Sequence, residues 1–204
     1  MPKHIFSFNH TVVAAVRQHI SKAVDSVEPK RYGQEPAYIA ALVHSLEGIV
    51  YEGPSGKIYF KSVVYSDRAR NSAESIFGAD VSITAEISDG HSFVRKAILV
   101  QSKMGEISKL SLKDKDFLRS QVTKMKKLTK APKIMQITDM NGKRLIHVVS
   151  GNSFLKGVNY RLINLESYFV GRVLTTLDGC TNDVIVSNIQ DSKLTQLRVL
   201  VDAV

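Results

Sequence analysis

The feature that most constrains the fold of this chain is a pair of predicted strands joined by a tight turn. Residues 80–88 alternate as a half-buried strand does, and Asp89-Gly90 is a strong turn signal. The second strand, 96–103, contains the continuous apolar run Ala97-Ile98-Leu99-Val100, which is typical of a central strand covered on both faces. A chain that buries such a strand needs helices on both sides of its sheet.

The rest of the chain supplies those helices and further strands. Helices are predicted from apolar residues at helical spacing, and strands from alternation and from turns that contain Gly or Asn. Residues 66–78 are polar and are predicted to be irregular. The order of elements predicts an α/β fold, in which helices flank a mixed sheet and an extra helix precedes the core. The predicted helices are 9–27, 36–47, 112–129 and 164–177, and the predicted strands are a hairpin over 49–64, then 133–138, 144–149 and 197–202.

The length and charge of the chain limit its class. A chain of 204 residues is long enough for one domain with a sizeable core. Its 28 Lys and Arg residues exceed its 19 Asp and Glu residues, which gives a formal net charge of +9. This excess favours a polyanionic partner such as nucleic acid. The alternative is that the positive charge only keeps the protein soluble.

Several other classes are excluded or disfavoured by composition. The single cysteine, Cys180, excludes an internal disulfide framework and a zinc site built from several thiolates. No apolar run is long enough to predict a transmembrane helix, so no membrane partner is expected. The first residues lack the apolar stretch of a secretory signal, and a cytoplasmic location is therefore expected.

Polar side chains gather at one end of the predicted strand pair. Gln101 and Lys103 are two residues apart on a strand and therefore project from the same face, and Asp80 opens the partner strand. Oxygen ligands of this kind suit Mg²⁺, with Mn²⁺ as a substitute, and a lysine beside the metal can orient or activate a water molecule. The equally weighted alternative is that Gln101 and Lys103 are the polar end of a strand that enters solvent.

These residues carry a resemblance to a known family. Gly78-Ala79-Asp80 before a strand, followed by Ile98-Leu99-Val100-Gln101-Ser102-Lys103, resembles the PD-(D/E)XK nuclease superfamily, in the Gln-x-Lys variant seen in Mrr-type restriction enzymes. The resemblance implies a restriction-endonuclease-like core over about 33–138. Residues 1–32 would then be a helical extension, and 139–204 would add strands and a helix to the same single domain.

The resemblance also implies further acidic residues. Family members often add a glutamate from the first core helix to the metal site, and Glu35 at the start of the predicted helix is the candidate here. Glu74 resembles an acidic residue that some members carry ahead of the aspartate. Both have ordinary alternatives, because an acid at a helix N-terminus is favourable through the dipole alone and Glu74 can pair with Arg68 or Arg70. Glu47 is a second helix-borne acid, at the other end of the helix.

The predicted helix 112–129 is the candidate nucleic-acid contact. Phosphate contacts of basic side chains make binding salt-dependent without reading sequence. A solvated basic face that complements the helix dipole is the alternative. The residues expected to contact nucleic acid are Gln121, on the polar side, and Lys124, Lys126 and Lys127, whereas Phe117, Leu118, Val122, Met125 and Leu128 are expected in the core.

The function implied is hydrolysis of phosphodiester bonds, in DNA more than RNA, by a Mg²⁺-dependent endonuclease. Such proteins often serve restriction or antiviral defence, and a homodimer or an activating partner protein would be consistent with the lack of a sequence-reading module. The alternative is a nuclease-fold protein that binds or assembles on nucleic acid without cutting it. The valine-rich stripe of the predicted helix 9–27 supports that alternative mildly, as a dimer face, although the more ordinary role of such a stripe is to cover the core.

Overall fold

A single mixed sheet of eight strands organises the protein. The computed structural model describes residues 6–28, 31–32, 34–65, 73–140 and 142–203. The strand order is β1-β2-β8-β3-β4-β5-β6-β7. The strands are β1 (Gly48–Gly53), β2 (Gly56–Val63), β3 (Val81–Ser88), β4 (Phe93–Met104), β5 (Lys133–Met140), β6 (Lys143–Ser150), β7 (Ile163–Asn164) and β8 (Thr195–Asp202).

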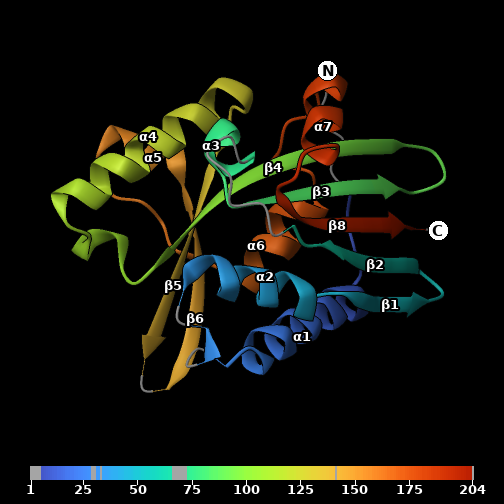
Figure 1. Ribbon diagram of the computed structural model, residues 1–204. Coiled ribbons are helices and arrows are strands. Elements are labelled where there is room, and N and C mark those ends of the chain that lie inside the picture. The colour runs from blue at the N-terminus through green and yellow to red at the C-terminus, as the bar shows by residue number, and fades with distance from the viewer. Residues whose placement is uncertain (1–5, 29–30, 33, 66–72, 141, 204) are drawn as a thin grey trace.

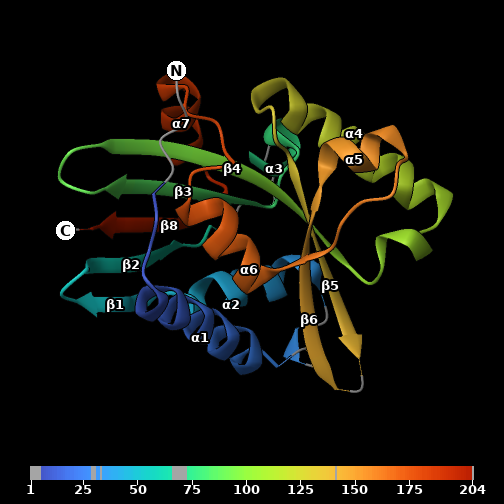
Figure 2. The same ribbon diagram turned by 180° about the vertical axis from the view of Figure 1, so that it is seen from behind.

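Helices cover the two faces of this sheet. Helices α1, α2 and α6 pack on one face and α4, α5 and α7 on the other, as Figures 1 and 2 show from opposite sides. The predicted α/β class is therefore confirmed. The helices are α1 (His10–Ser26), α2 (Glu35–Ser45), α3 (Ala73–Phe77), α4 (Leu112–Leu128), α5 (Gly151–Lys156), α6 (Leu165–Tyr168) and α7 (Asp183–Gln190), with a 3-10 turn at Ile107–Lys109 and a π-helix at Phe169–Leu174.

The predicted central strand pair is confirmed. Strands β3 and β4 pair in antiparallel fashion with Val81 opposite Val100, and the turn between them is closed by backbone N–H groups that donate to Asp89 Oδ1. Helix α4 then returns the chain, so that β5 runs parallel to β4. Side chains of β4 alternate between the two cores, with Ile98 facing α1 and α2 and Leu99 facing α4.

The last strand occupies an unexpected place in the sheet. Strand β8 lies between β2 and β3, antiparallel to the first and parallel to the second. The C-terminal segment therefore forms part of the middle of the sheet, rather than extending a core completed before residue 139. Sequence order alone gives no signal for this insertion, because the pairing joins strands more than a hundred residues apart.

Helix α1 belongs to the same core as the sheet. Asn9 Oδ1 accepts a hydrogen bond from the Val12 N–H and so caps the helix. The stripe formed by Val12, Val16 and Ile20 is fully buried in one cluster with α2 and the sheet. The suggested role of this stripe as a dimer face is therefore wrong, since the apolar side chains already cover the core.

The remaining differences concern short elements. The sequence does not predict helices α3, α5 and α7 or strand β7, because each spans no more than eight residues and is too short for a periodic pattern to be recognised. Residues 66–78 are accordingly not wholly irregular, since α3 lies within them. The predicted helix 164–177 is α6 continued by the π-helix and ends at Leu174. Among the described residues, no helix has the length and apolar character to cross a membrane.

Lys96 of β4 is a fully buried cation next to the π-helix. Its Nζ donates to the backbone carbonyls of Arg172, at 3.2 Å, and Asp178, at 2.8 Å. Burial lowers the pKa of Lys96 to about 7, and the Asp178 carboxylate opposes this change. Between that value and its ordinary pKa near 10.5, the unfolded chain binds the proton and the folded chain does not.

This difference predicts a pH-dependent stability. Stability rises with pH wherever the unfolded state binds more protons, so the contribution of Lys96 becomes more favourable from pH 7 to pH 10. A Lys96→Met variant lacks this pH-dependent contribution to stability. Relative to this variant, the melting temperature of the wild type is expected to rise by about 7–14 °C over that range, as thermal unfolding by circular dichroism would measure. A difference that stays constant with pH would show that Lys96 is charged in the folded protein.

Candidate functional site

Asp80 and Gln101 lie side by side at the end of the β3–β4 pair. The Asp80 N–H donates to the Val100 carbonyl at 3.0 Å, which extends the ladder by one residue beyond β3. Asp80 Oδ2 accepts hydrogen bonds from Gln101 Nε2 at 2.6 Å and from the Ser102 N–H at 2.7 Å. Gln101 is only 1% exposed, and its Oε1 has no hydrogen-bond partner among the described residues. A buried amide oxygen beside a carboxylate is costly unless a donor or a cation satisfies it.

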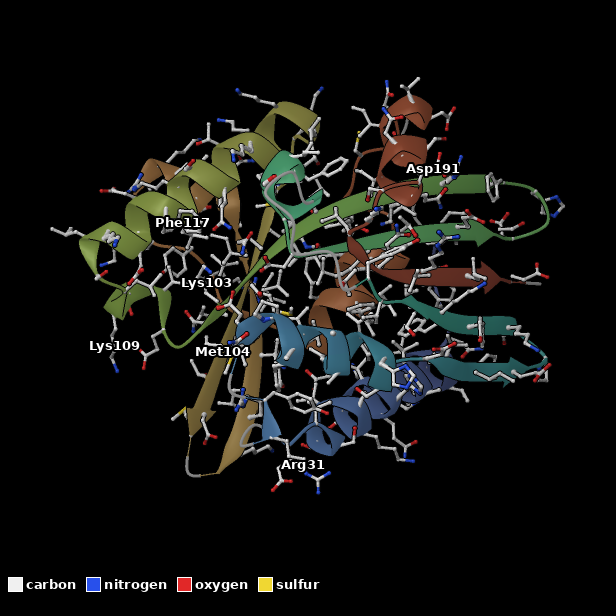
Figure 3. The ribbon with its side chains drawn as sticks, viewed as in Figure 1. Arg31, Lys103, Met104, Lys109, Phe117 and Asp191 are labelled. Atoms are coloured by element: carbon white, nitrogen blue, oxygen red, sulfur yellow. The ribbon has the colours of Figure 1, made fainter. Side chains whose placement is uncertain are left out.

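Glu35 comes to the same place from a different element. It is the first residue of α2, followed by Pro36, a residue that suits the first turn of a helix. Glu35 Oε1 accepts from Lys103 Nζ at 3.0 Å, and Oε2 accepts from the Met104 N–H at 2.9 Å. The Glu35 and Lys103 side chains are mostly buried. Lys103 and Met104 are labelled at the end of β4 in Figure 3, where β4 passes between α4 and α2.

Ser102 links the two carboxylates. Its Oγ lies 3.1 Å from Glu35 Oε1 and also makes a short hydrogen bond with Asp80 Oδ2. A hydroxyl has one hydrogen, so Ser102 can donate a hydrogen bond to only one of the two carboxylates at a time. Sequence reasoning missed Ser102, because alternation along β4 places it on the opposite face from Gln101 and Lys103. Its position between them was the only signal.

The alternative acid, Glu47, is engaged elsewhere. It accepts a hydrogen bond from Ser62 Oγ at 2.5 Å and lies 3.8 Å from His44 Nδ1, at the far end of α2. Glu74 lies on α3, two residues before Ile76, but its side chain falls outside the described residues. Arg68 and Arg70, suggested as its partners, lie outside them as well. Of the three acids proposed beside Asp80, the structure brings Glu35 to the site.

Gly78 fixes the approach of α4 to this site. Its φ is +71°, and a Cβ at this position would lie 2.4 Å from the backbone carbonyl oxygen of Gln121. The positive φ and the close backbone approach both require a residue without a side chain at position 78. The contact holds the chain two residues before Asp80 against the middle of α4.

The buried face of α4 differs from the one predicted. Gln121 is only 5% exposed and lies on the core side of the helix, because it follows Leu118 by three residues and precedes Met125 by four. The prediction that Gln121 is on the polar side is wrong. Phe117, expected in the core, is 60% exposed and lies one turn before Gln121 on α4. Figure 3 labels it on this helix.

The lysines of α4 do not form one surface. Successive residues of an α-helix are rotated by about 100°, so Lys124 and Lys126 point in nearly opposite directions. Lys124 Nζ donates to the Ser75 carbonyl at 3.0 Å and so ties α4 to α3. Lys126 and Lys127 are exposed near the C-terminal end of the helix, as its dipole favours.

The donors gathered here suit a hard cation. Two carboxylates and a buried amide oxygen are the ligand types that Mg²⁺ and Mn²⁺ accept, and Lys103 offsets one of the two negative charges. Among the described residues, no group of three or more His, Cys, Asp and Glu side chains is arranged to hold a metal, so a metal site here depends on the Gln101 amide as a third ligand.

Comparisons of the chain with protein-family models, with curated proteins and with solved structures find no match. Support for a function therefore comes from the chemistry of the side chains at the end of β4.

Proposed function

We propose that the protein is a metal-dependent nuclease that hydrolyses phosphodiester bonds, with DNA as the expected polymer. One observation carries the proposal. Glu35, Asp80 and the Gln101-Ser102-Lys103 segment come from three separate elements and meet in one hydrogen-bonded cluster. These are the residues to which the PD-(D/E)XK resemblance gives roles, and a cluster of two acids, an amide and an ammonium is the chemistry that such an enzyme uses.

The metal would be held by oxygen atoms already present. Asp80 and Glu35 would supply carboxylate oxygens and Gln101 its orphaned Oε1, which is the atom of the cluster that lacks a partner among the described residues. A bound Mg²⁺ would polarise the phosphoryl oxygen and lower the pKa of a water molecule. Gln101 now donates through Nε2 to Asp80, and rotation of its amide would present the oxygen instead.

Lys103 would act on the attacking water and on the phosphate. Its Nζ donates to Glu35 Oε1, so the ammonium has a fixed position next to the Glu35 carboxylate. From there it can orient a water molecule through a hydrogen bond and offset the negative charge that grows on the phosphate. Ser102 would hold the two carboxylates at their present spacing. The net charge of +9 would attract the polyanionic substrate.

The finer fold is part of the same proposal. Helix α2, strands β3 and β4, helix α4 and strand β5 follow one another in the order expected of a restriction-endonuclease-like core. The insertion of β8 between β2 and β3 is a departure that such a core would have to accommodate. Because the insertion lies on the far side of β3 from β4, it leaves the neighbourhood of Gln101 and Lys103 intact.

A cleavage panel tests the proposal. Purified protein would be incubated with plasmid, linear duplex DNA, single-stranded DNA and RNA, each with Mg²⁺, with Mn²⁺ and with EDTA. Cutting that requires the metal supports a nuclease and identifies the polymer. A protein that binds none of these polymers and cuts none would refute the proposal, whereas binding without cutting would favour the alternative below.

The alternative, a nuclease-fold protein that binds nucleic acid without cutting it, has one observation in its favour. The polar groups of the site largely satisfy one another without a metal, because Lys103 pairs with Glu35 while Gln101 and Ser102 donate to Asp80. An amide at position 101 also lacks the negative charge of a carboxylate. Both features are consistent with a site that has lost its metal.

The substitution Gln101→Glu distinguishes the two. If the site binds metal, a carboxylate in place of the amide adds one negative ligand, and Mn²⁺ affinity measured by calorimetry is expected to rise about tenfold over the wild type. If the site has lost its metal, the wild type shows no binding, and the new acid destabilises the protein through repulsion from Asp80. An Asp80→Asn variant, which lacks a proposed metal ligand, serves as the control that should bind no Mn²⁺.

A further inference from the structure

Arg144 of β6 is a buried cation with weak partners. Its side chain is only 6% exposed, and its guanidinium carbon lies 4.7 Å from the centroid of the Tyr38 ring. Nη1 lies 3.8 Å from the Met104 sulfur and Nη2 lies 3.9 Å from Asp139 Oδ2. The Nε has no hydrogen-bond partner among the described residues. Burial raises the pKa of Tyr38, and Arg144 opposes this rise through its charge and a side-chain hydrogen bond.

These contacts do not meet the needs of a guanidinium. Arginine presents five N–H donors in a planar fork, and a thioether sulfur is a weak acceptor. The carboxylate of Asp139 lies beyond hydrogen-bond distance, and that side chain is half exposed. A cation withdrawn from water without charged, hydrogen-bonded partners is unfavourable, so a buried arginine of this kind is suited to bind an anion.

Arg144 lies next to the proposed site. Tyr38 follows Glu35 by three residues on α2, which places the two side chains on the same side of the helix, one turn apart. Met104, the other neighbour of the guanidinium, donates its backbone N–H to Glu35 Oε2. Of the residues that contact the Arg144 guanidinium, Met104 is hydrogen-bonded to Glu35 and Tyr38 lies one helical turn from it. The guanidinium itself makes no ion pair with the Glu35 carboxylate within 4.0 Å among the described residues.

We propose that Arg144 binds a phosphate of the nucleic-acid backbone beside the one that is cut. This inference rests on the proposed nuclease function and adds a second anion subsite to it. The guanidinium fork matches two phosphate oxygens, and the Tyr38 ring holds its plane in place from one side. Met104 and Asp139, which are both exposed, cover the nitrogens, and their side chains turn aside when phosphate binds.

Inorganic phosphate alone tests the subsite without any cleavage. Melting temperatures would be measured with phosphate and with chloride at equal ionic strength, for the wild type, Arg144→Met and Arg17→Met. The last variant removes an exposed arginine of α1 and controls for general effects of phosphate and of net charge. Phosphate is expected to raise the melting temperature of the wild type and of Arg17→Met by about 2–4 °C more than that of Arg144→Met. Equal shifts in all three proteins would overturn the proposal.

Binding of a labelled oligonucleotide in EDTA gives the second readout. Loss of one phosphate contact is expected to reduce the slope of log affinity against log salt by about 0.7–0.9 in Arg144→Met and not in Arg17→Met. If Arg144→Met does not fold, Arg144→Lys keeps the charge and loses the fork, and at least a fivefold weaker affinity is expected. Unchanged slope or affinity in these variants would refute the subsite. A wild type that binds phosphate through Arg144 but neither binds nor cuts nucleic acid would refute the nuclease function and the nucleic-acid backbone as the ligand, and would leave Arg144 as a phosphate site.

Discussion

Replacing Asp80 with asparagine is expected to remove metal-dependent cleavage, with a rate at least about 1,000-fold lower than that of the wild type. Asp80 is the acid to which Gln101 and Ser102 both donate, so it is the centre of the cluster. Asparagine keeps the shape of the side chain and removes the negative charge that would hold the metal. Single-turnover cleavage of linear duplex DNA in Mg²⁺ is the measurement.

Two further variants make this result specific. Lys103→Met removes the ammonium that Glu35 positions and is expected to lower the rate by about 100-fold or more, with metal binding retained. Lys109→Met is the matched control, because Lys109 is exposed, pairs with Glu106 and follows β4 by only five residues. It should cut like the wild type. Cleavage that persists in Asp80→Asn and Lys103→Met would place the chemistry elsewhere or indicate a contaminating nuclease.

Much of the site follows from local sequence. The alternation over 80–88, the turn at Asp89-Gly90 and the apolar run that ends at Val100 are local signals, and together they determine that Asp80 meets Gln101. The place of Glu35 at the first residue of α2 is also local, because Pro36 marks that end of the helix. Its contact with Lys103 is not local, and the sequence could suggest it only through a family resemblance.

The parts that sequence reasoning missed depend on tertiary contacts. Strand β8 pairs with β2 and β3 across more than a hundred residues, and no periodic pattern records that choice. The polarity of Gln121 predicts the solvent side of α4, but its spacing from Leu118 and Met125 puts it on the core side, where Gly78 also approaches the helix. Phe117, one turn earlier, lies beyond this contact and is exposed. A prediction from polarity alone therefore puts Gln121 and Phe117 on the wrong sides of α4, because the sequence does not show which elements pack against this helix.

The substitution Gly78→Ala is expected to give the largest loss of stability among single changes near the site. The new Cβ would lie 2.4 Å from the Gln121 carbonyl oxygen and 2.9 Å from the Lys124 Cβ, and the alanine would keep an unfavourable positive φ. Backbone strain and the forced separation of α4 together should cost about 3 kcal/mol or more. Thermal unfolding would show this as a melting temperature lower by about 6–12 °C.

The variant Gly90→Ala separates the effect of backbone strain from the effect of displacing α4. Gly90 has a φ of +78°, close to that of Gly78, but a Cβ there would meet no atom within 4 Å. Its replacement should therefore cost only the strain, about 1 kcal/mol, and should leave cleavage unchanged. Gly78→Ala should also slow cleavage, because a shift of the chain at residue 78 moves Asp80 relative to Gln101. Equal losses of stability in the two variants would mean that α4 can yield at this contact, in which case the approach of α4 does not hold Asp80 in place.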